Sequence, residues 1–374
     1  MILEELKLHH FRNYEDLTVK FNPGINVLIG ENAQGKTNLL EAIYVLALTK
    51  SHRTANDREL ISWNEHEASV AGRVKKKLGS LPLAVQFSSR GKRVRMNHLF
   101  QPRLSSYIGA LNVVLFAPED LELVKGAPVV RRQFMDTEFS QMSNQYLFAL
   151  GKYNQVLKQR NQYLKQLKYH QQSDKVLLGV LSEELAQSGG TVIALRYQLL
   201  KQLEVWAQEL HQHISTQKET LKFKYVSQVE TTDEKAAADY QQELLAQYQQ
   251  RAEHEIELGT TLTGPHRDDV AFLVNGQNVQ SFGSQGQQRT TALSVKLAEI
   301  ELMKQQTNEY PLLLLDDVLS ELDNDRQTHL LTAIQDKVQT FLTTTSLSGV
   351  ARQLINQPAI YHIEHGQISE EETQ

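Results

Sequence analysis

The chain has 374 residues, 40% of them hydrophobic, which is enough for a sizeable core and, at roughly 100–200 residues per domain, for two or three structural units. It contains no cysteine, which excludes disulfides, thiolate nucleophiles, iron–sulfur clusters and cysteine-ligated zinc and fits a reducing compartment. No apolar run approaches the roughly 18 residues that span a bilayer, and the formal net charge of −5 argues weakly against a nucleic-acid-binding domain, which is usually basic.

The first clear element is a short apolar strand, Ile25–Ile29, followed directly by a glycine-rich loop and by a helical pattern at residues 38–43. The loop matches G-x-x-x-x-G-K-[ST] at every fixed position and consists of Gly30, Glu31, Asn32, Ala33, Gln34, Gly35, Lys36 and Thr37. Its glycines allow backbone N–H groups to face the β- and γ-phosphates of a nucleotide, Lys36 adds positive charge, and Thr37 offers a hydroxyl ligand to Mg²⁺. The order of strand, loop and helix therefore predicts a phosphate-binding site.

Residues 68–118 form a basic block that contains no Asp or Glu but nine of the chain's 39 Lys and Arg residues. Residues 83–87 and 94–96 within the block are predicted to be strands on either side of a turn. Two interpretations stay open: a surface for the phosphate backbone of DNA, or the solvated face of a hairpin. The candidates for DNA contact are Lys75, Lys76, Arg90, Lys92, Arg93 and Arg95, and a second candidate surface carries Lys152, Lys158 and Lys165.

The middle of the chain is predicted to be helical, because no proline occurs between Pro128 and Pro265 and good helix formers predominate there. One apolar stripe repeats every seven residues over residues 150–164, and a second stripe runs over residues 178–199. A polar turn at residues 168–175 separates the two stripes. We therefore expect an antiparallel helical hairpin.

A second apolar strand, residues 312–315, ends in two carboxylates, Asp316 and Asp317. Ligands of open parallel sheets bind at the carboxyl ends of the strands. Asp316 is therefore the expected Mg²⁺ ligand, and Asp317 is placed to orient or deprotonate an attacking water.

The distance between the two motifs indicates how the chain is divided. Lys36 and Asp316 are 280 residues apart, so one site must be assembled from both ends of the chain with a long insertion between them. We predict an N-terminal head part at residues 1–125, a helical insertion with the hairpin at 126–260, and a C-terminal head part at 261–374.

Two further motifs resemble those of ABC-type ATPases. Residues 284–287 resemble the signature loop in the variant form of the SMC-like DNA-repair relatives, and residues 319–323 resemble the D-loop. The resemblance implies an α/β fold, an ABC-type P-loop ATPase head with a mostly helical insertion. Such heads dimerise around two ATP molecules, so Ser284, Gly286 and Gln287 would contact the γ-phosphate held by the partner, and Asp323 would make cross-subunit contacts.

Stretches elsewhere are similar to bacterial RecF, and they extend from the N-terminus to about residue 341. They are residues 11–14, 50–54, 117–121, 131–136 and 264–269. The resemblance implies a cytoplasmic, nucleoid-associated protein of DNA replication, recombination, repair and the SOS response, with ATP and Mg²⁺ as cofactors. It implies a weak DNA-dependent ATPase that forms an ATP-dependent homodimer and binds double-stranded DNA, gapped DNA and single-strand–duplex junctions, without a membrane. The implied partners are RecR and, in the same pathway, RecO and RecA.

Three positions depart from the ABC pattern. Asp317 stands where such heads usually carry Glu, and the shorter side chain suits slow turnover. Thr345 falls about where many heads carry a switch His. No Q-loop glutamine is evident, and Glu119 occupies a plausible place for one.

The roles of five other positions are considered next. Arg53 either contacts the nucleotide or a partner subunit, or forms a structural salt bridge. His266 and Arg267 either bind phosphate or brace the head, with bracing preferred. Trp63 and Trp206 are expected to be packing residues.

Two other functions compete with the resemblance. The ATPase subunit of a membrane ABC transporter shares the P-loop and the signature loop, but it does not account for the 280-residue gap or for residues 264–269. A P-loop kinase acting on a small molecule explains neither the signature loop nor the D-loop.

Overall fold

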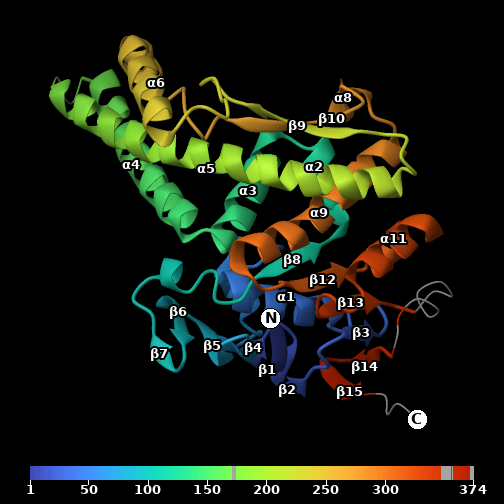
Figure 1. The fold of residues 1–374 in the computed structure, drawn as a ribbon. Helices are drawn as coiled ribbons and strands as arrows, with labels where there is room; N and C mark the ends of the chain where they lie inside the picture. The colour runs from blue at the N-terminus through green and yellow to red at the C-terminus, as the bar shows by residue number, and fades with distance from the viewer. Residues whose placement is uncertain (171–173, 347–354, 356, 371–374) are drawn as a thin grey trace. The chain divides into compact units, whose positions relative to one another are not determined.

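The computed structural model describes residues 1–170, 174–346, 355 and 357–370 (Figure 1). The chain forms two compact units. The first combines Met1–Asp120 with Lys296–Gln374, and the second is Leu121–Val295. Both ends of the chain therefore build the first unit.

The first unit contains a mainly parallel sheet in the order β15-β14-β3-β13-β12-β8. Its strands are β3 (Ile25–Ile29), β8 (Val113–Phe116), β12 (Leu312–Asp316), β13 (Thr340–Thr344), β14 (Ala359–Glu364) and β15 (Gln367–Glu370). Among the described residues of this sheet, only β14 and β15 pair antiparallel. The four leucines of β12 are fully buried, as expected for a central parallel strand. Parallel pairing places the carboxyl ends of β3, β13 and β12 at one edge of the sheet.

A second sheet of the first unit is antiparallel, in the order β2-β1-β4-β5-β6-β7. Its strands are β1 (Ile2–Phe11), β2 (Tyr14–Lys20), β4 (Glu67–Lys76), β5 (Gly79–Ser88), β6 (Gly91–Met96) and β7 (Leu99–Phe100). Buried and exposed side chains alternate along β4 and β5, so one face of this sheet belongs to the core and the other faces water. The strands expected at residues 83–87 and 94–96 are confirmed as parts of β5 and β6.

Helix α1 (Lys36–Leu48) contacts strands of both sheets. Eleven of its thirteen residues are buried, and it shares one hydrophobic cluster with side chains of both sheets. The N-terminus of α1 is thus fixed by the core of the unit. The shorter helices of this unit are η1 (Asp57–Leu60), η2 (Leu104–Ser106), α10 (Val318–Glu321) and α11 (Asn324–Ile334), and η3 (Pro118–Leu121) ends at the boundary between the units.

The second unit is mostly helical and carries a three-stranded antiparallel sheet, β11-β10-β9 (Figure 1). Its helices are α2 (Glu122–Lys125), α3 (Pro128–Met142), α4 (Asn144–Lys168), α5 (Val176–Ile214), α6 (Ala237–Gln250), α7 (Ala252–Leu258) and α8 (Val279–Phe282). Its strands are β9 (Leu221–Val226), β10 (Asp269–Val274) and β11 (Gln277–Asn278), and α9 (Gln285–Thr307) begins in this unit and ends in the first.

The predicted helical hairpin consists of α4 and α5. Tyr146 contacts Arg196 and Arg160 contacts Ser182, so the two helices run antiparallel. Helix α5 has 39 residues, about 58 Å, and continues well beyond the predicted stripe. The connection expected at 168–175 includes residues 171–173, which lie outside the described residues. In the part of the chain that the structure describes, no helix is long and apolar enough to cross a membrane.

The second unit extends further along the chain than the insertion predicted at 126–260. Strand β10 pairs with β9 along its whole length, from Asp269 with Val226 to Val274 with Leu221. Arg131 of α3 also forms an ion pair with Asp269, at 2.7 Å. These contacts assign residues 261–295, which we expected in the C-terminal head part, to the second unit.

Candidate nucleotide-binding site

The phosphate-binding loop connects β3 to α1, and its two fixed glycines are required by the geometry. Gly35 has φ of 119°, and a Cβ added there would lie 2.7 Å from Asn13 Nδ2. A Cβ on Gly30 would lie 2.4 Å from the carbonyl oxygen of Ile363. Only glycine fits these two positions without displacing backbone or neighbouring side chains.

Lys36, the first residue of α1, folds back over the loop. Its Nζ donates hydrogen bonds to the carbonyl oxygens of Gly30, at 2.6 Å, and Glu31, at 2.7 Å. Burial lowers the pKa of Lys36, while the nearby charges of Asp317 and Asp316 act in the opposite direction. The lysine, the loop and both carboxylates therefore belong to one electrostatic site, as the sequence predicts.

Thr37 and Asp316 meet although they lie 279 residues apart. Thr37 Oγ1 donates a hydrogen bond to Asp316 Oδ1 at 3.0 Å. A hydroxyl and a carboxylate are the hard oxygen donors that Mg²⁺ takes, usually from one or two carboxylates together with water and phosphate oxygens. The hydroxyl of Thr37 and the carboxylate of Asp316 therefore fit Mg²⁺ shared with a nucleotide. Among the described residues, no group of three or more His, Cys, Asp or Glu side chains that could hold a metal is present.

Thr343 on β13 also contacts this carboxylate, and the sequence analysis missed it. Its Oγ1 donates to Asp316 Oδ1 at 2.8 Å and accepts the backbone N–H of Asp317 at 2.9 Å. The residue expected near a switch position was Thr345, but Thr345 follows the strand and is exposed. The parallel register pairs Asp316 with Thr343, which explains the difference of two residues. Finding this contact from the sequence requires a strand at residues 340–344 whose carboxyl end aligns with that of the predicted strand at 312–315.

Asp317 lies immediately after β12 and precedes α10. Its φ is 52°, in the left-handed region, so the backbone turns sharply out of the strand at this residue. Asp is one of the few side chains that adopt this conformation at modest cost.

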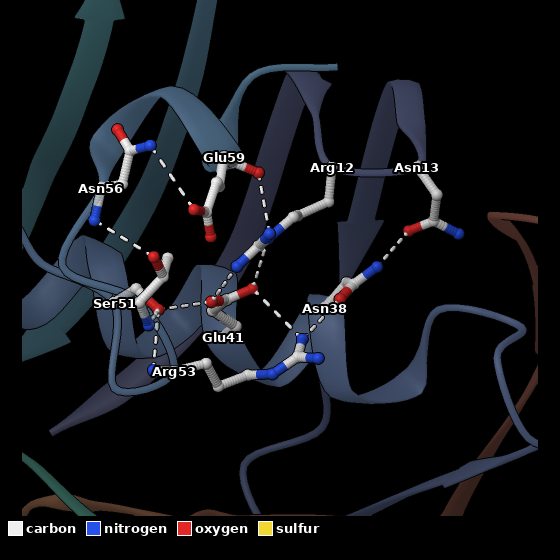
Figure 2. A network of polar contacts seen from close by, with 9 residues as sticks. Arg12, Asn13, Asn38, Glu41, Ser51, Arg53, Asn56 and Glu59 are labelled. Atoms are coloured by element: carbon white, nitrogen blue, oxygen red, sulfur yellow. Dashed lines mark hydrogen bonds and ion pairs between the residues drawn. The ribbon is translucent and has the colours of Figure 1, made fainter. Parts of the chain in front are cut away.

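A buried carboxylate, Glu41 of α1, organises the loops beside the P-loop (Figure 2). Arg12 donates to both oxygens of Glu41 at 2.8 Å, Ser51 donates to one of them at 2.5 Å, and Arg53 forms an ion pair at 3.6 Å. Burial favours a raised pKa of Glu41, but the hydrogen bonds from Arg12 and Ser51 and the two guanidinium charges outweigh it and lower the pKa. Arg53 thus makes the structural salt bridge that the sequence left open.

The same network reaches the P-loop through two asparagines (Figure 2). Arg53 donates to Asn38 Oδ1 at 2.9 Å, and Asn38 Nδ2 donates to Asn13 Oδ1 at 2.8 Å. Asn13 in turn donates to the carbonyl oxygen of Gln34, at 3.3 Å. Residues of the stretches at 11–14 and 50–54 therefore support the P-loop through a chain of hydrogen bonds.

The packing role expected for Trp63 is wrong. Its side chain is 93% exposed and lines a cavity of about 920 Å³ together with Asn13, Asn38 and Arg53. Trp206, on α5, is partly buried as expected. Glu119 lies in η3 and is exposed, and its place in a Q-loop stays a prediction.

The signature-like residues form the start of α9. Ser284 Oγ accepts the backbone N–H of Gln287 at 3.2 Å, and Gln287 Oε1 accepts the backbone N–H of Ser284 at 2.9 Å. This reciprocal pair is a capping box, which leaves the helix N-terminus with an exposed serine. Gly286 lies in the first turn, between the two capping residues. Asp323 caps α11 in a similar way, because its Oδ1 accepts the backbone N–H of Arg326 at 2.9 Å.

His266 braces the second unit. Its Nδ1 is 2.6 Å from the hydroxyl of Tyr153, and its Nε2 is 3.2 Å from the carbonyl oxygen of Thr261. Burial lowers the pKa of His266 to about 4, so the ring is neutral at pH 7. Arg267 is exposed.

The chain is similar to known proteins along most or all of its length. A family model described as an AAA domain matches residues 5–344. Proteins named DNA replication and repair protein RecF, from Limosilactobacillus fermentum and Limosilactobacillus reuteri, are 68% and 66% identical to the chain over 372 residues, which is 100% of each chain.

Solved structures show the same fold. The recombination mediator protein RecF-ATPrS of the RecFOR pathway superposes with a TM-score of 0.91 and 31% identity, over 98% of this chain and 97% of that one. An Smc head bound to the C-winged helix domain of ScpA gives a TM-score of 0.56 at 14% identity, over 99% and 97%, which concerns the fold alone. The predicted α/β ATPase head with a helical insertion is confirmed, and the chain belongs to the RecF family.

Proposed function

We propose that the chain is an ATP-switched DNA recombination and repair protein. The observation that carries this proposal is the contact between Thr37 and Asp316, which joins the two ends of the chain beside a complete phosphate-binding loop. The name of its relatives, DNA replication and repair protein, and the description of a structural relative as the recombination mediator protein RecF-ATP support it.

In this proposal residues 30–37 bind the phosphates of ATP. Lys36 leaves the loop carbonyls for the phosphate oxygens, and Thr37 and Asp316 hold Mg²⁺. The ion supplies positive charge to the phosphate oxygens when it is bound. Asp317 orients or deprotonates the attacking water, and its short side chain suits slow hydrolysis. With these roles the chain acts as a weak ATPase whose activity depends on DNA.

Two copies of the chain dimerise head to head around ATP. Ser284, Gly286 and Gln287 of one subunit contact the γ-phosphate held by the other, and Asp323 contributes to the contact between subunits. The capping box at the start of α9 supports this role, because a helix N-terminus favours negative charge.

The dimer binds double-stranded and gapped DNA and junctions between single and double strands, and it acts with RecR and RecO to help load RecA at gaps. The basic block at residues 68–118 supplies its DNA contacts. We place the protein in the cytoplasm, associated with the nucleoid. The transporter alternative has lost its support, because RecF proteins match the chain along its whole length.

Sedimentation of the chain with and without ATP and a gapped duplex tests the proposal. Wild-type chain is expected to dimerise with ATP and to bind the duplex, whereas Lys36→Arg stays monomeric, because its bulkier head group does not fit the phosphate site. Lys20→Arg, at an exposed position of β2, serves as the matched control. Dimerisation of Lys36→Arg to the wild-type extent would refute the switch.

A further inference from the structure

The first turn of α9 is tied to a carboxylate outside the helix. Gln287 Nε2 donates to Glu219 Oε1 at 2.8 Å, and Glu219 lies 68 positions earlier, in the segment between α5 and β9. Gln287 Oε1 accepts the backbone N–H of Ser284 at 2.9 Å. An amide oxygen only accepts hydrogen bonds and an amide nitrogen only donates them, so these two contacts fix which way the Gln287 side chain is turned.

This arrangement leaves two hydrogen-bond donors at the start of the helix for a ligand. Gln287 Nε2 carries two hydrogens, and Glu219 takes one of them. The hydroxyl of Ser284 accepts the backbone N–H of Gln287 at 3.2 Å, so its own hydrogen remains. Ser284 is exposed and Gln287 is partly exposed. Within the described part of the chain neither hydrogen is taken by an acceptor, and both are suited to a phosphate oxygen.

The second oxygen of Glu219 is held by a buried histidine. His211, in the last turn of α5, places its Nε2 3.1 Å from Glu219 Oε2. An ionised carboxylate only accepts hydrogen bonds, so Nε2 carries the hydrogen of this pair. The His211 side chain is fully buried, and burial lowers its pKa, while the contact with Glu219 acts in the opposite direction. Glu219 therefore has a defined position although it lies in a connecting segment.

The same histidine contacts α9 at a second point. His211 Nδ1 is 3.3 Å from Ser294 Oγ, and Ser294 donates to the carbonyl oxygen of Thr290 at 2.7 Å. Both His211 and Ser294 are fully buried. Ser294 follows Gln287 by seven residues, which is about two helical turns, so the two contacts lie on one face of α9. The end of α5 and the segment after it thus hold the beginning of α9 at two places.

We propose that Glu219 is a positioning residue for ATP-dependent dimerisation: it turns Gln287 so that the start of α9 presents its donors to the γ-phosphate held by a second copy of the chain. This inference rests on the proposed function, in which Ser284 and Gln287 contact that phosphate, and it adds a residue that acts through Gln287. Without the carboxylate the Gln287 amide is free to turn over, and its capping contact with Ser284 is then lost. A helix N-terminus binds an anion through donors that point at it.

The test compares ATP-dependent dimerisation, measured by sedimentation, in Glu219→Ala and Glu219→Gln. Glu219→Ala is expected to raise the dissociation constant of the dimer about 10- to 100-fold, the equivalent of one hydrogen bond to a charged group. Glu219→Gln keeps an acceptor for Gln287, and its amide nitrogen donates to His211 Nε2 when the neutral ring carries its hydrogen on Nδ1. This variant should therefore dimerise at least as well as the wild type.

The matched control is Glu204→Ala, which removes another carboxylate of the second unit. Glu204 Oε2 accepts the backbone N–H of Phe223 at 2.7 Å and Oε1 pairs with Lys222 at 3.4 Å, so these partners lie on β9 rather than α9. Its side chain is 16% exposed, close to the 21% of Glu219. Both alanine variants should lower the urea midpoint, whereas only Glu219→Ala should weaken the dimer. Binding of a fluorescent ATP analogue to the monomer should not change in either, because the P-loop belongs to the first unit.

A double-mutant cycle shows whether Glu219 acts through Gln287. Gln287→Ala and Glu219→Ala/Gln287→Ala are expected to have equal dimer dissociation constants, because the carboxylate of the first then has nothing to orient. Equal weakening of the dimer by Glu204→Ala and Glu219→Ala, equal losses in Glu219→Gln and Glu219→Ala, or additive effects in the cycle would each overturn the inference. A wild-type chain that stays monomeric with ATP would instead overturn the proposed function on which the inference rests, and the wild type alone reveals it.

Discussion

Replacement of Thr343 by Val is expected to weaken the response of the protein to Mg²⁺ without removing its affinity for nucleotide. Val has nearly the same shape as Thr but lacks the hydroxyl that donates to Asp316 at 2.8 Å and accepts from the backbone of Asp317 at 2.9 Å. A hydrogen bond to a charged group contributes about 1.5–3 kcal/mol. At about 1.4 kcal/mol per tenfold change, the Mg²⁺ concentration for half-maximal ATP hydrolysis should rise roughly 10- to 100-fold, the range found when outer partners of metal ligands are removed.

The assay is a Mg²⁺ titration of ATP hydrolysis, with binding of a fluorescent ATP analogue in EDTA measured in parallel. Thr343→Ser keeps the hydroxyl and should behave like the wild type. Thr345→Val makes the same chemical change two residues further on, at an exposed position, and should have no effect. Equal Mg²⁺ requirements for Thr343→Val and Thr345→Val would refute the positioning of Asp316 by Thr343.

Two further predictions concern stability. Glu41→Gln leaves the Arg12 guanidinium without its buried partner and should lower the free energy of unfolding by about 3–5 kcal/mol in urea titrations. Glu59→Gln is the control, since Arg12 uses only the backbone carbonyl of Glu59, and similar losses in both variants would contradict the network. His266, with its pKa lowered to about 4, stays neutral in the folded chain while the unfolded chain takes up a proton below about pH 6.5, so stability should fall as the pH falls from 6.5 to 4. His266→Gln should flatten that dependence of the urea midpoint, and an unchanged slope would exclude His266 as its source.

Features encoded within a few consecutive residues were predictable. The P-loop requires glycines at two defined positions, and its strand and helix adjoin it in the sequence. The strand before Asp316 consists of four leucines, and its burial follows from composition. Local hydrophobic pattern and the chemistry of phosphate binding were sufficient for both.

Features that depend on pairing between distant segments were not predictable. Thr343 meets Asp316 only because β12 and β13 align in one particular register, and the pairing of β9 with β10 moved the unit boundary from 260 to 295. Arg160 lies within the apolar stripe predicted over residues 150–164. It is fully buried and pairs with Glu255 at 2.7 Å, a partner 95 positions away in the sequence that no local pattern reveals.

The left-handed backbone at Asp317 has a consequence for how the site can change over evolutionary time. A residue in this conformation is more costly for Glu than for Asp, whose short side chain tolerates it. A longer carboxylate at position 317 would therefore add backbone strain to the turn between β12 and α10. Side-chain length and main-chain shape are thus coupled at this corner, so Asp317→Glu would change both the reach of the carboxylate and the strain of the turn.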